Sequence, residues 1–545
     1  MKFQGQATED IVAALKRRGF TYRRKYENGW LCFDGQFSTN GVAHRIQLSV
    51  SPNFDEPPSI RLIGGKSALI LPHLNPDGEL CYIAKGSLVF DWFNALENTI
   101  ACVDRAEKVL ADVLAGKHVE DLEQEFFAYW GESDFCFYDF DPGAHEVYGT
   151  SIRAYAFPHV GKNLNMLVTD DRMRSHAKLK AMGWGEGETE VKIVTARTSI
   201  SPYPNQSGWP PQTVNDILTW QRQLSLGFAR HLKRLLLSAY SKNGQSLALV
   251  IIESPKLPYA FLVHFEETPQ KVRLKALLPP LLEKTVIPLR VIRIDDGYIA
   301  QRNLVGGKSL AGKRIVLIGC GTIGGYLADM LVKAGVGTSG GKLTLVDPDM
   351  LGPQNIGRHR LGHESMFKRK SLQLKEELVR SSPGANIFPV VNDAKNVDFG
   401  HIDLLIDATG EQALTEWLTW RFSNKNPILA CWVEGPGSAA RALIKADPEH
   451  GCSRCLSQKN NSHTYRVFKN HPENVLQGYG CENLYVPFPA SASIQAAALA
   501  MEMVQSWLNG ASGATLRSRA LDQGLEVHFL DGVLPRAEGC PACSS

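Results

Sequence analysis

The stretch RIVLIGCGTIGG, residues 314–325, decides the fold of the last part of this chain. Arg314–Ile318 is apolar enough for a buried strand, and Tyr326–Ala334 has the apolar spacing of a helix. The turn between them carries the glycine spacing G-x-G-x-x-G, at Gly319, Gly321 and Gly324. Such a turn lets backbone N–H groups at a helix N-terminus approach a phosphate closely. We therefore predict a nucleotide-binding α/β domain here.

Polar side chains follow the next predicted strand, Lys342–Val346. Asp347 ends that strand and is placed to reach a ribose. Asn355, Arg358 and Lys370 follow soon after, where a dinucleotide-binding domain needs no cluster of phosphate contacts. Arginine and lysine there could bind a triphosphate and offset charge that develops at its α-phosphate. A basic run such as the one that ends at Lys370 is, on its own, more typical of a solvated surface.

The spacing D-x-D-x₅-N-x₂-R, followed by a lysine, resembles the adenylation domain of ubiquitin-activating-type enzymes, the ThiF/MoeB family. The resemblance implies that ATP and Mg²⁺ bind. This family often has D-x-T-D-N after a later strand, where this chain has Asp407-Ala-Thr-Gly410. The resemblance therefore leaves Asp407 or Glu411 to hold the metal. It also suggests that Arg302 serves the ATP of a partner subunit, against the alternative of an ordinary surface arginine.

The composition bounds the class of protein. A chain of 545 residues is too long for one core, so we expect two to four domains. A net charge of +3 and 21% charged residues give no reason to expect a nucleic-acid groove or a membrane surface. We find no apolar run near the length of a membrane span and no signal-peptide pattern, so a cytoplasmic protein is expected.

The first part of the chain predicts an α+β domain. Thr8–Arg18 has helical spacing, and further helical patterns lie within Trp92–Ala115. Between them Trp30–Phe37, Val42–Val50 and Ser59–Ile63 have the patterns of an antiparallel meander. A loop with a cysteine, Cys81, follows the last of these strands.

This order of elements resembles a ubiquitin-conjugating domain. The shared motifs are Pro52, Pro57 and Pro58 in a proline turn, His73-Leu-Asn75, Cys81, and Trp92 near the following helix. The resemblance implies that Cys81 carries an acyl group as a thioester, although an isolated cysteine is more often an inert, half-buried thiol. Asn75 lies closer to Cys81 than is usual in the family, so His73 or a backbone amide could stabilise the oxyanion instead.

The middle of the chain is least informative. Thr213–Tyr240 has helical spacing, and Ser246–Glu253 and Tyr259–Phe265 have strand patterns. No catalytic cluster is visible in the sequence. We predict an α+β linker domain that acts as a spacer.

Eleven cysteines without a secretory signal favour thiol or metal chemistry over disulfides. Two C-x₂-C pairs can close a tetrahedral structural zinc site, formed by Cys452, Cys455, Cys540 and Cys543. We interpret five others as packing residues, namely Cys32, Cys102, Cys136, Cys320 and Cys431.

Cys481 precedes a helix that is expected to begin near Ser493, in a loop with glycine and proline. This segment resembles the ThiF-family segment whose cysteine takes the acyl group from the adenylate. The alternative reading is a zinc ligand or a buried thiol, but the four paired cysteines already satisfy a zinc ion.

The predicted fold is therefore α/β and α+β multidomain: a ubiquitin-conjugating-like domain at 1–140, a linker domain at 141–300 and a Rossmann-like adenylation domain at 301–545. The predicted function is a fused activating and conjugating enzyme. It would adenylate a partner protein's C-terminus, carry it on Cys481 and then Cys81, and transfer it to a target amine.

The domain order resembles the antiviral CBASS-associated enzymes, which attach the C-terminus of a cGAS-like nucleotidyltransferase to other molecules. That resemblance implies a homodimer and a role in phage defence. A bacterial system that uses a ubiquitin-like modifier fits nearly as well. A ThiF-type sulfur-carrier activator and an NAD-dependent oxidoreductase remain as alternatives.

Overall fold

The computed structural model describes residues 2–39, 41–64, 70–75, 77–84, 90–131, 134–140, 152–158, 164–183, 189–205, 209–241, 247–256, 258–265, 274–304, 306–460, 464–470, 476–477, 485–510 and 513–543. The chain forms two compact units. Unit 1 comprises Met1–Tyr138, Tyr148–Val168 and Glu186–Ile292, and unit 2 comprises Asp139–Val147, Thr169–Gly185 and Arg293–Ser545.

Unit 1 begins with a small α+β domain, the N-terminal domain. Its antiparallel sheet has the order β1-β2-β3-β4. The elements are α1 (Lys2–Arg17), β1 (Thr21–Lys25), β2 (Leu31–Thr39), β3 (Val42–Val50), β4 (Ser59–Leu62), η1 (Trp92–Asn94) and α2 (Ala95–Leu114). In β3 the alternate residues Ile46, Leu48 and Val50 are buried, because one face of the sheet packs against α1 and α2. The predicted helix, meander and second helix are confirmed.

A short connecting segment leads from this domain into the second domain of unit 1. It contains η2 (Val119–Glu123) and α3 (Phe126–Trp130). The second domain is a closed barrel with the strand order β10-β11-β5-β7-β6-β8-β9. Its strands are β5 (Phe135–Asp139), β6 (Arg153–Pro158), β7 (Leu164–Thr169), β8 (Thr189–Arg197), β9 (Leu247–Glu253), β10 (Tyr259–His264) and β11 (Val286–Arg293).

Helices cover one side of this barrel domain, and the alternating strand residues that face them are apolar. These helices are α5 (Val214–Leu224), α6 (Leu226–Ser241) and α7 (Leu278–Leu282). The helical pattern of Thr213–Tyr240 is therefore two helices rather than one, because Ser225 takes an extended conformation between them. Strand β5 precedes residue 141 but belongs to the barrel.

Unit 2 is built on an eight-stranded sheet, with α4 (Arg172–Ala181) and α8 (Asp296–Arg302) at its start. The sheet order is β14-β13-β12-β15-β16-β17-β18-β19, and its first five strands run parallel. The strands are β12 (Arg314–Ile318), β13 (Lys342–Val346), β14 (Ile387–Val390), β15 (Leu404–Asp407), β16 (Ile428–Glu434), β17 (Ala439–Lys445), β18 (Leu516–Ala520) and β19 (Asp531–Gly532). This is the predicted Rossmann-like order of alternating strands and helices.

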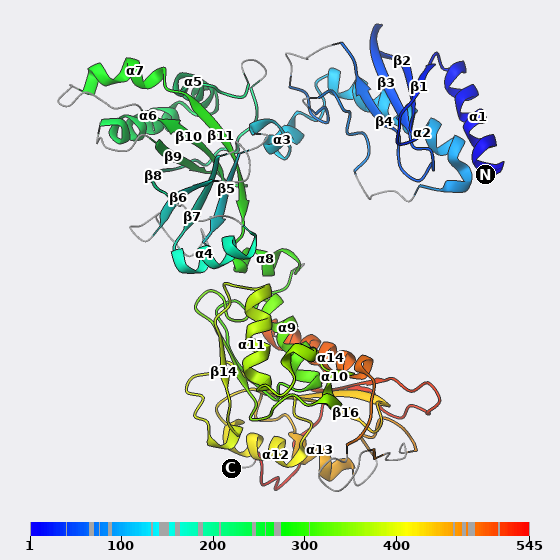
Figure 1. The fold of residues 1–545 in the computed structure, drawn as a ribbon, viewed down its shortest axis with the longest axis vertical. Coiled ribbons are helices and arrows are strands. Elements are labelled where there is room, and N and C mark those ends of the chain that lie inside the picture. The colour runs from blue at the N-terminus through cyan, green and yellow to red at the C-terminus, as the bar shows by residue number, and fades with distance from the viewer. Residues whose placement is uncertain are drawn as a thin grey trace. The chain divides into compact units, whose positions relative to one another are not determined.

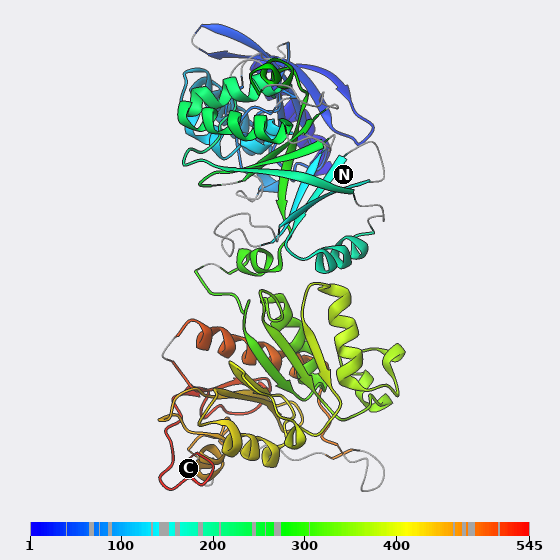
Figure 2. The same cartoon turned by 90° about the vertical axis from the view of Figure 1, so that its left-hand side faces the viewer.

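Helices cover both faces of the sheet of unit 2. Residues of α9 (Thr322–Lys333), α11 (Lys370–Ser381) and α14 (Ala490–Leu508) pack on one face, and α12 (Gln412–Phe422) packs on the other. In both views α12 (yellow) lies across the sheet from α14 (orange; Figures 1 and 2). Helix α9 starts at Thr322, four residues earlier than predicted, so the glycine turn leads directly into the helix.

Among the described residues, we find no helix with the length and apolar character that crossing a membrane requires.

Candidate active site

The glycine turn of unit 2 is fixed by close backbone packing. Gly319 has a φ of +88°, and a Cβ there would lie 2.9 Å from the Thr409 side chain. A Cβ on Gly324 would lie 1.8 Å from the Gly319 carbonyl oxygen. A Cβ on Gly321 would meet no atom within 4 Å among the described residues, its chain neighbours aside, and Gly321 lines a cavity. Gly319 and Gly324 therefore serve the turn itself, and Gly321 leaves open the space in front of it.

That cavity has a volume of about 600 Å³ and lies at the carboxyl ends of β12, β13 and β15. This is the edge at which open α/β sheets bind ligands. The structure brings six predicted residues to its wall: Gly319, Gly321, Asp347, Asn355, Arg358 and Lys370. Three carboxylates also line the cavity, those of Asp349, Asp393 and Glu411. From the sequence, Glu411 was expected only as an alternative metal ligand, and no role was predicted for Asp349 or Asp393.

Asp347 is held by the backbone of the turn. Its carboxylate accepts hydrogen bonds from the Cys320 N–H at 2.7 Å and the Asp349 N–H at 2.8 Å. Burial raises the pKa of Asp347 above its ordinary value, whereas the nearby Lys370 ammonium lowers it. Lys370 itself is nearly buried and pairs with Asp349 at 3.0 Å. The pair keeps a cation at the cavity wall without leaving its charge unpaired.

Arg358 also lines the cavity, and its guanidinium packs against two aromatic rings. Its guanidinium lies 4.1 Å from the centre of the Phe488 ring and 5.3 Å from that of Tyr485, and Nη1 donates to the Val486 carbonyl at 3.0 Å. Burial lowers the pKa of Arg358 from its ordinary value. Its Nε is buried without a hydrogen-bond partner among the described residues. A buried donor without an acceptor fits an anionic ligand in the cavity, such as a nucleotide phosphate.

Asp407 does not reach this cavity. Its carboxylate accepts hydrogen bonds from the Thr409 N–H and hydroxyl on one oxygen and from the Thr415 hydroxyl on the other. The residue is 1% exposed, and burial raises its pKa. Glu411 is exposed and lines the cavity instead.

A buried histidine supports the turn from behind. The Nε2 of His359 lies 2.8 Å from the Cys320 carbonyl oxygen, and Nδ1 accepts a hydrogen bond from the Leu361 N–H. Nε2 therefore carries the proton of the neutral ring. Burial lowers the pKa of His359 to about 4, so the ring stays neutral near pH 7. Cys320 is fully buried, as a packing residue should be.

The four paired cysteines converge in unit 2. The sulfur–sulfur distances are 3.7 Å for Cys452–Cys455, 3.7 Å for Cys452–Cys540 and 3.6 Å for Cys455–Cys543. Tetrahedral zinc with Zn–S bonds of about 2.3 Å places its sulfurs about 3.8 Å apart, whereas a disulfide needs about 2.05 Å. All four thiols are buried. The cluster therefore fits a zinc ion.

Cys81, in the N-terminal domain, is exposed at the end of a small loop. Its N–H donates to the His73 carbonyl at 2.7 Å, and Leu74 and Leu80 pair as an isolated bridge. Partial burial raises the pKa of the thiol, and the carboxylates of Glu125 and Glu79 raise it further. The exposed thiol is accessible to an acyl donor, but its neighbours do not favour the thiolate.

The remaining predicted residues are Cys481, Asn75, Arg302 and four cysteines expected to be packing residues. Cys481 lies outside the described residues, so its prediction remains open. Asn75 is exposed beside the loop, and Arg302 is exposed at the end of α8. Cys32, Cys102, Cys136 and Cys431 are buried, as predicted.

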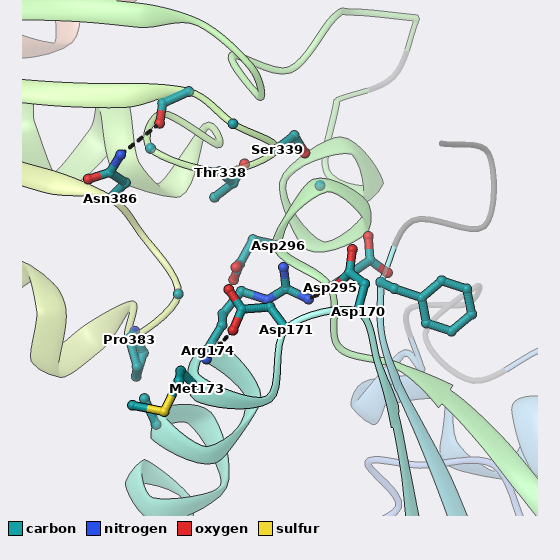
Figure 3. A pocket seen from close by; sticks show the side chains of 17 residues that line it. Asp170, Asp171, Met173, Arg174, Asp295, Asp296, Thr338, Ser339, Pro383 and Asn386 are labelled. Atoms are coloured by element: carbon teal, nitrogen blue, oxygen red, sulfur yellow. Dashed lines mark hydrogen bonds and ion pairs between the residues drawn. The ribbon is translucent and has the colours of Figure 1, made fainter. Parts of the chain in front are cut away.

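A second cavity in unit 2, of about 670 Å³, lies at the amino ends of β13 and β14 (Figure 3). Carboxylates of two segments line it, but each has a partner. Asp170 pairs with Arg174, Asp171 caps α4, and two more acids pair elsewhere, Asp295 with Arg293 and Asp296 with Lys178. Among the described residues, no side chain that lines this second cavity has a buried donor without a partner, whereas Arg358 Nε is such a donor in the first.

Three residues that hold the loop before Cys81 were not predicted from the sequence. They are Asp121, Glu125 and Tyr129, which contact Leu71, His73 and Leu74. Their spacing of four residues could have indicated one helical face. The other contacts that were not predicted are those of Arg358 with Tyr485, Val486 and Phe488. Tyr485 and Phe488 carry no signal in the sequence besides aromatic character, and Val486 contributes only its backbone carbonyl.

Comparison with known proteins agrees with both halves of this picture. Residues 299–530 match the ThiF family, and residues 13–136 match the prokaryotic E2 family B. These matches confirm the two resemblances.

Among relatives, the ATP-dependent ubiquitin transferase-like protein Cap2 of Pseudomonas aeruginosa is 40% identical over 547 residues, covering 99% of each chain. Cap2 of Escherichia coli is 27% identical over 524 residues, covering 87% of this chain and 86% of the relative. A crystal structure of E. coli MccB with ATP aligns with a TM-score of 0.32 and 16% identity, covering 43% of this chain and 66% of MccB. The identity and coverage shared with the P. aeruginosa protein show that this chain belongs to the family of ATP-dependent ubiquitin transferase-like proteins named Cap2.

Proposed function

We propose that the chain adenylates the C-terminal carboxylate of a partner protein and passes the acyl group through two cysteines to a target amine. The proposal rests on two sites that occur in one chain, a cavity suited to a nucleotide and an exposed cysteine. A cavity whose wall presents a glycine turn, Arg358 and Lys370 accompanies an exposed thiol, Cys81, in a domain that matches a prokaryotic E2 family.

In the first step, a carboxylate oxygen of the partner attacks the α-phosphate of ATP. The bond between the α-phosphorus and the bridging oxygen breaks, and pyrophosphate leaves with that oxygen. Arg358 and Lys370 would stabilise the negative charge that develops on the phosphates, and backbone N–H groups at the start of α9 would bind a phosphate directly. Asp347 and Asn355 would orient the nucleotide. Activation is needed because a carboxylate is a poor electrophile, whereas AMP is a good leaving group.

We assign Mg²⁺ at this cavity to the exposed acids Glu411 and Asp349, because Asp407 is buried and does not line the cavity. The ion would supply positive charge to the phosphates. Asp407 would act by fixing the loop that carries Thr409 against Gly319. A structural zinc ion would be held by the four buried cysteines.

Two thioester exchanges follow in this proposal. The Cys481 thiolate attacks the acyl carbon and AMP leaves; the Cys81 thiolate then attacks and Cys481 leaves as a thiolate. Finally a target amine attacks, loses its proton and displaces the Cys81 thiolate, which gives an amide. Each exchange needs a thiolate, so the raised pKa of Cys81 makes its own step sensitive to pH.

The relatives' name, ubiquitin transferase-like, supports a protein substrate for this chain as well. We propose that the activated partner is a cGAS-like nucleotidyltransferase of a CBASS antiphage system, with a ubiquitin-like modifier as the alternative, and that the chain works as a cytoplasmic homodimer. Light scattering of the purified chain would test the dimer. Incubation with each candidate partner would separate the two substrates.

The deciding experiment incubates the chain with ATP, Mg²⁺ and a cGAS-like nucleotidyltransferase and maps thioesters by mass spectrometry. Wild type should carry the acyl group on both cysteines. Cys81→Ala should still charge Cys481 but form no amide, and Cys481→Ala should charge neither cysteine. Unchanged amide formation by Cys81→Ala would instead support a sulfur-carrier activator. Absence of ATP–pyrophosphate exchange, with hydride transfer from NADH, would refute adenylation altogether.

A further inference from the structure

The segment that joins the N-terminal domain to the barrel presents three polar side chains at intervals of four residues. Asp121, Glu125 and Tyr129 all contact the stretch that leads to Cys81. Asp121 Oδ2 lies 3.1 Å from His73 Nε2, and Glu125 Oε1 lies 3.1 Å from His73 Nδ1. The other Glu125 oxygen accepts a hydrogen bond from the His73 N–H at 2.9 Å. His73 is therefore held through its backbone N–H, and each ring nitrogen faces a carboxylate to which it can donate when the ring is protonated.

Tyr129 holds the residues on both sides of His73. Its hydroxyl donates to the Leu71 carbonyl at 2.9 Å and also contacts the Leu74 carbonyl oxygen. His73 takes a left-handed conformation with a φ of +60°, which a residue with a side chain rarely adopts without support. The contacts from Glu125 and Tyr129 supply that support.

The held stretch is in direct contact with the reactive cysteine. The His73 carbonyl accepts the hydrogen bond of the Cys81 N–H at 2.7 Å, and the bridge between Leu74 and Leu80 closes the loop between them. A shift of His73 would therefore move the backbone of Cys81. The position of the thiol depends on residues that lie outside the cysteine loop.

The opposite side of the same segment is anchored in the barrel domain. Trp130 is fully buried, stacks on Phe126 at 5.1 Å and donates from Nε1 to the Ala260 carbonyl at 2.9 Å. Trp209 donates from Nε1 to the Tyr129 carbonyl at 2.7 Å. These contacts fix α3 against the barrel, because buried aromatic side chains contribute much of the packing energy.

We propose that the connecting segment, anchored in the barrel domain, positions the conjugating cysteine: its side chains Asp121, Glu125 and Tyr129 fix the His73 stretch and so aim Cys81 at its acyl donor and acceptor. This inference rests on the proposed thioester at Cys81 and extends it, because it gives the middle domain a role beyond a spacer. Acyl transfer depends steeply on the placement of the nucleophile, so loss of the support slows transfer without removing the thiol. Asp121, Glu125 and Tyr129 are positioning residues.

The first test variant is Tyr129→Phe in the full chain, which removes one hydroxyl and keeps the ring. Tyr26→Phe is the matched control, because the Tyr26 hydroxyl contacts Cys32 and not the cysteine loop. The probe is a glycyl-peptide thioester, which acylates Cys81 without adenylation, and free lysine then discharges it. We expect Tyr129→Phe to slow both acylation and discharge of Cys81 about tenfold, with the control at the wild-type rate.

A second readout does not depend on the acyl chemistry. Hydrogen exchange of peptides that cover residues 71–81 should be faster in Tyr129→Phe and unchanged in Tyr26→Phe, because the Cys81 N–H bond to His73 opens more often. ATP–pyrophosphate exchange should be equal in all variants. If hydrogen exchange rises while acylation and discharge stay at wild-type rates, or if none of them changes, the positioning proposal is wrong.

Glu125→Gln is the second variant, in case Tyr129→Phe folds poorly. Its control is Glu79→Gln, because both carboxylates raise the pKa of Cys81 but only Glu125 holds His73. Removing charge alone should speed acylation in Glu79→Gln, whereas Glu125→Gln should be slower than that control. Equal rates in the two variants would overturn the proposal. A wild-type chain that acylates from the probe but never from ATP and partner would fail the proposed function and leave the positioning result standing.

Discussion

The nucleotide cavity and the cysteine loop differ in where their parts come from along the chain. The glycine turn, Asp347, Arg358 and Lys370 all lie within residues 314–370, on two consecutive strands of the sheet and the segments that follow them. The loop that carries Cys81 is held by side chains 48 to 58 positions from the residues they contact. A local site leaves its signature in sequence spacing, whereas a site assembled from distant segments leaves only scattered polar residues.

The largest expected effect tests the local site. Gly324→Ala places a Cβ 1.8 Å from the Gly319 carbonyl oxygen, so the turn must open, and we expect a loss of about 3 kcal/mol of stability or more, with no ATP binding. Gly321→Ala is the control, because a Cβ added at Gly321 would have no neighbouring atom within 4 Å among the described residues. It should melt like wild type but lose stabilisation by ATP. Thermal unfolding with and without ATP measures both, and equal melting of the two variants would contradict a turn fixed by backbone packing.

The four-cysteine cluster lies between the two extremes, since each C-x₂-C pair is local but the pairs are 88 residues apart. Cys540→Ser should remove one zinc equivalent per chain and lower the free energy of unfolding by about 3 kcal/mol. Metal analysis and thermal melts would measure this. Cys431→Ser, at a buried cysteine outside the cluster, is the control for metal content. Retention of zinc by Cys540→Ser would exclude the tetrahedral site.

Arg358 tests how far a site can depend on local sequence alone. The residue belongs to a local motif, but the side chains it packs against are about 130 positions away in the chain. Arg358→Lys keeps the charge but cannot keep the planar contacts with Phe488 and Val486, so we expect ATP–pyrophosphate exchange to fall about 100-fold. Phe488→Leu keeps the motif intact and should cost about fivefold. If Phe488→Leu left the rate of ATP–pyrophosphate exchange unchanged, the contact with Phe488 would contribute nothing to that rate and the local motif would be sufficient for it.

The smallest expected effect concerns pH at the cysteine loop. Partial burial raises the pKa of Cys81, and the nearby carboxylates of Glu125 and Glu79 raise it further, so its thiolate fraction near pH 7 is below that of a free thiol and increases as pH rises. Glu79→Gln removes one of these charges, which lowers the pKa and should speed alkylation of Cys81 by iodoacetamide about threefold near pH 7. The two rates should converge at high pH, where both thiols are ionised. A constant ratio at every pH would point to access rather than charge.

Particular residues show where prediction from sequence ended. Helix α9 and strands β12 and β13 were predictable because apolar periodicity reports burial directly. The family resemblance left Asp407 or Glu411 to hold the metal. In the structure Glu411 lines the cavity, whereas Asp407 is buried and accepts hydrogen bonds from Thr409 and Thr415, contacts that have no fixed spacing in the sequence. The closed barrel was not predicted, because its strands pair far out of sequence order and β8 runs parallel to β9.

The sequence by itself predicted the glycine turn, the two cations Arg358 and Lys370, the two C-x₂-C pairs and Cys81 in its conjugating-like domain, because each depends on residue type at short spacing. Only the tertiary structure decided which carboxylates face the nucleotide cavity, what seats Arg358 and what holds His73 above Cys81. Those outcomes depend on burial and on contacts between segments that become neighbours only when the whole core packs.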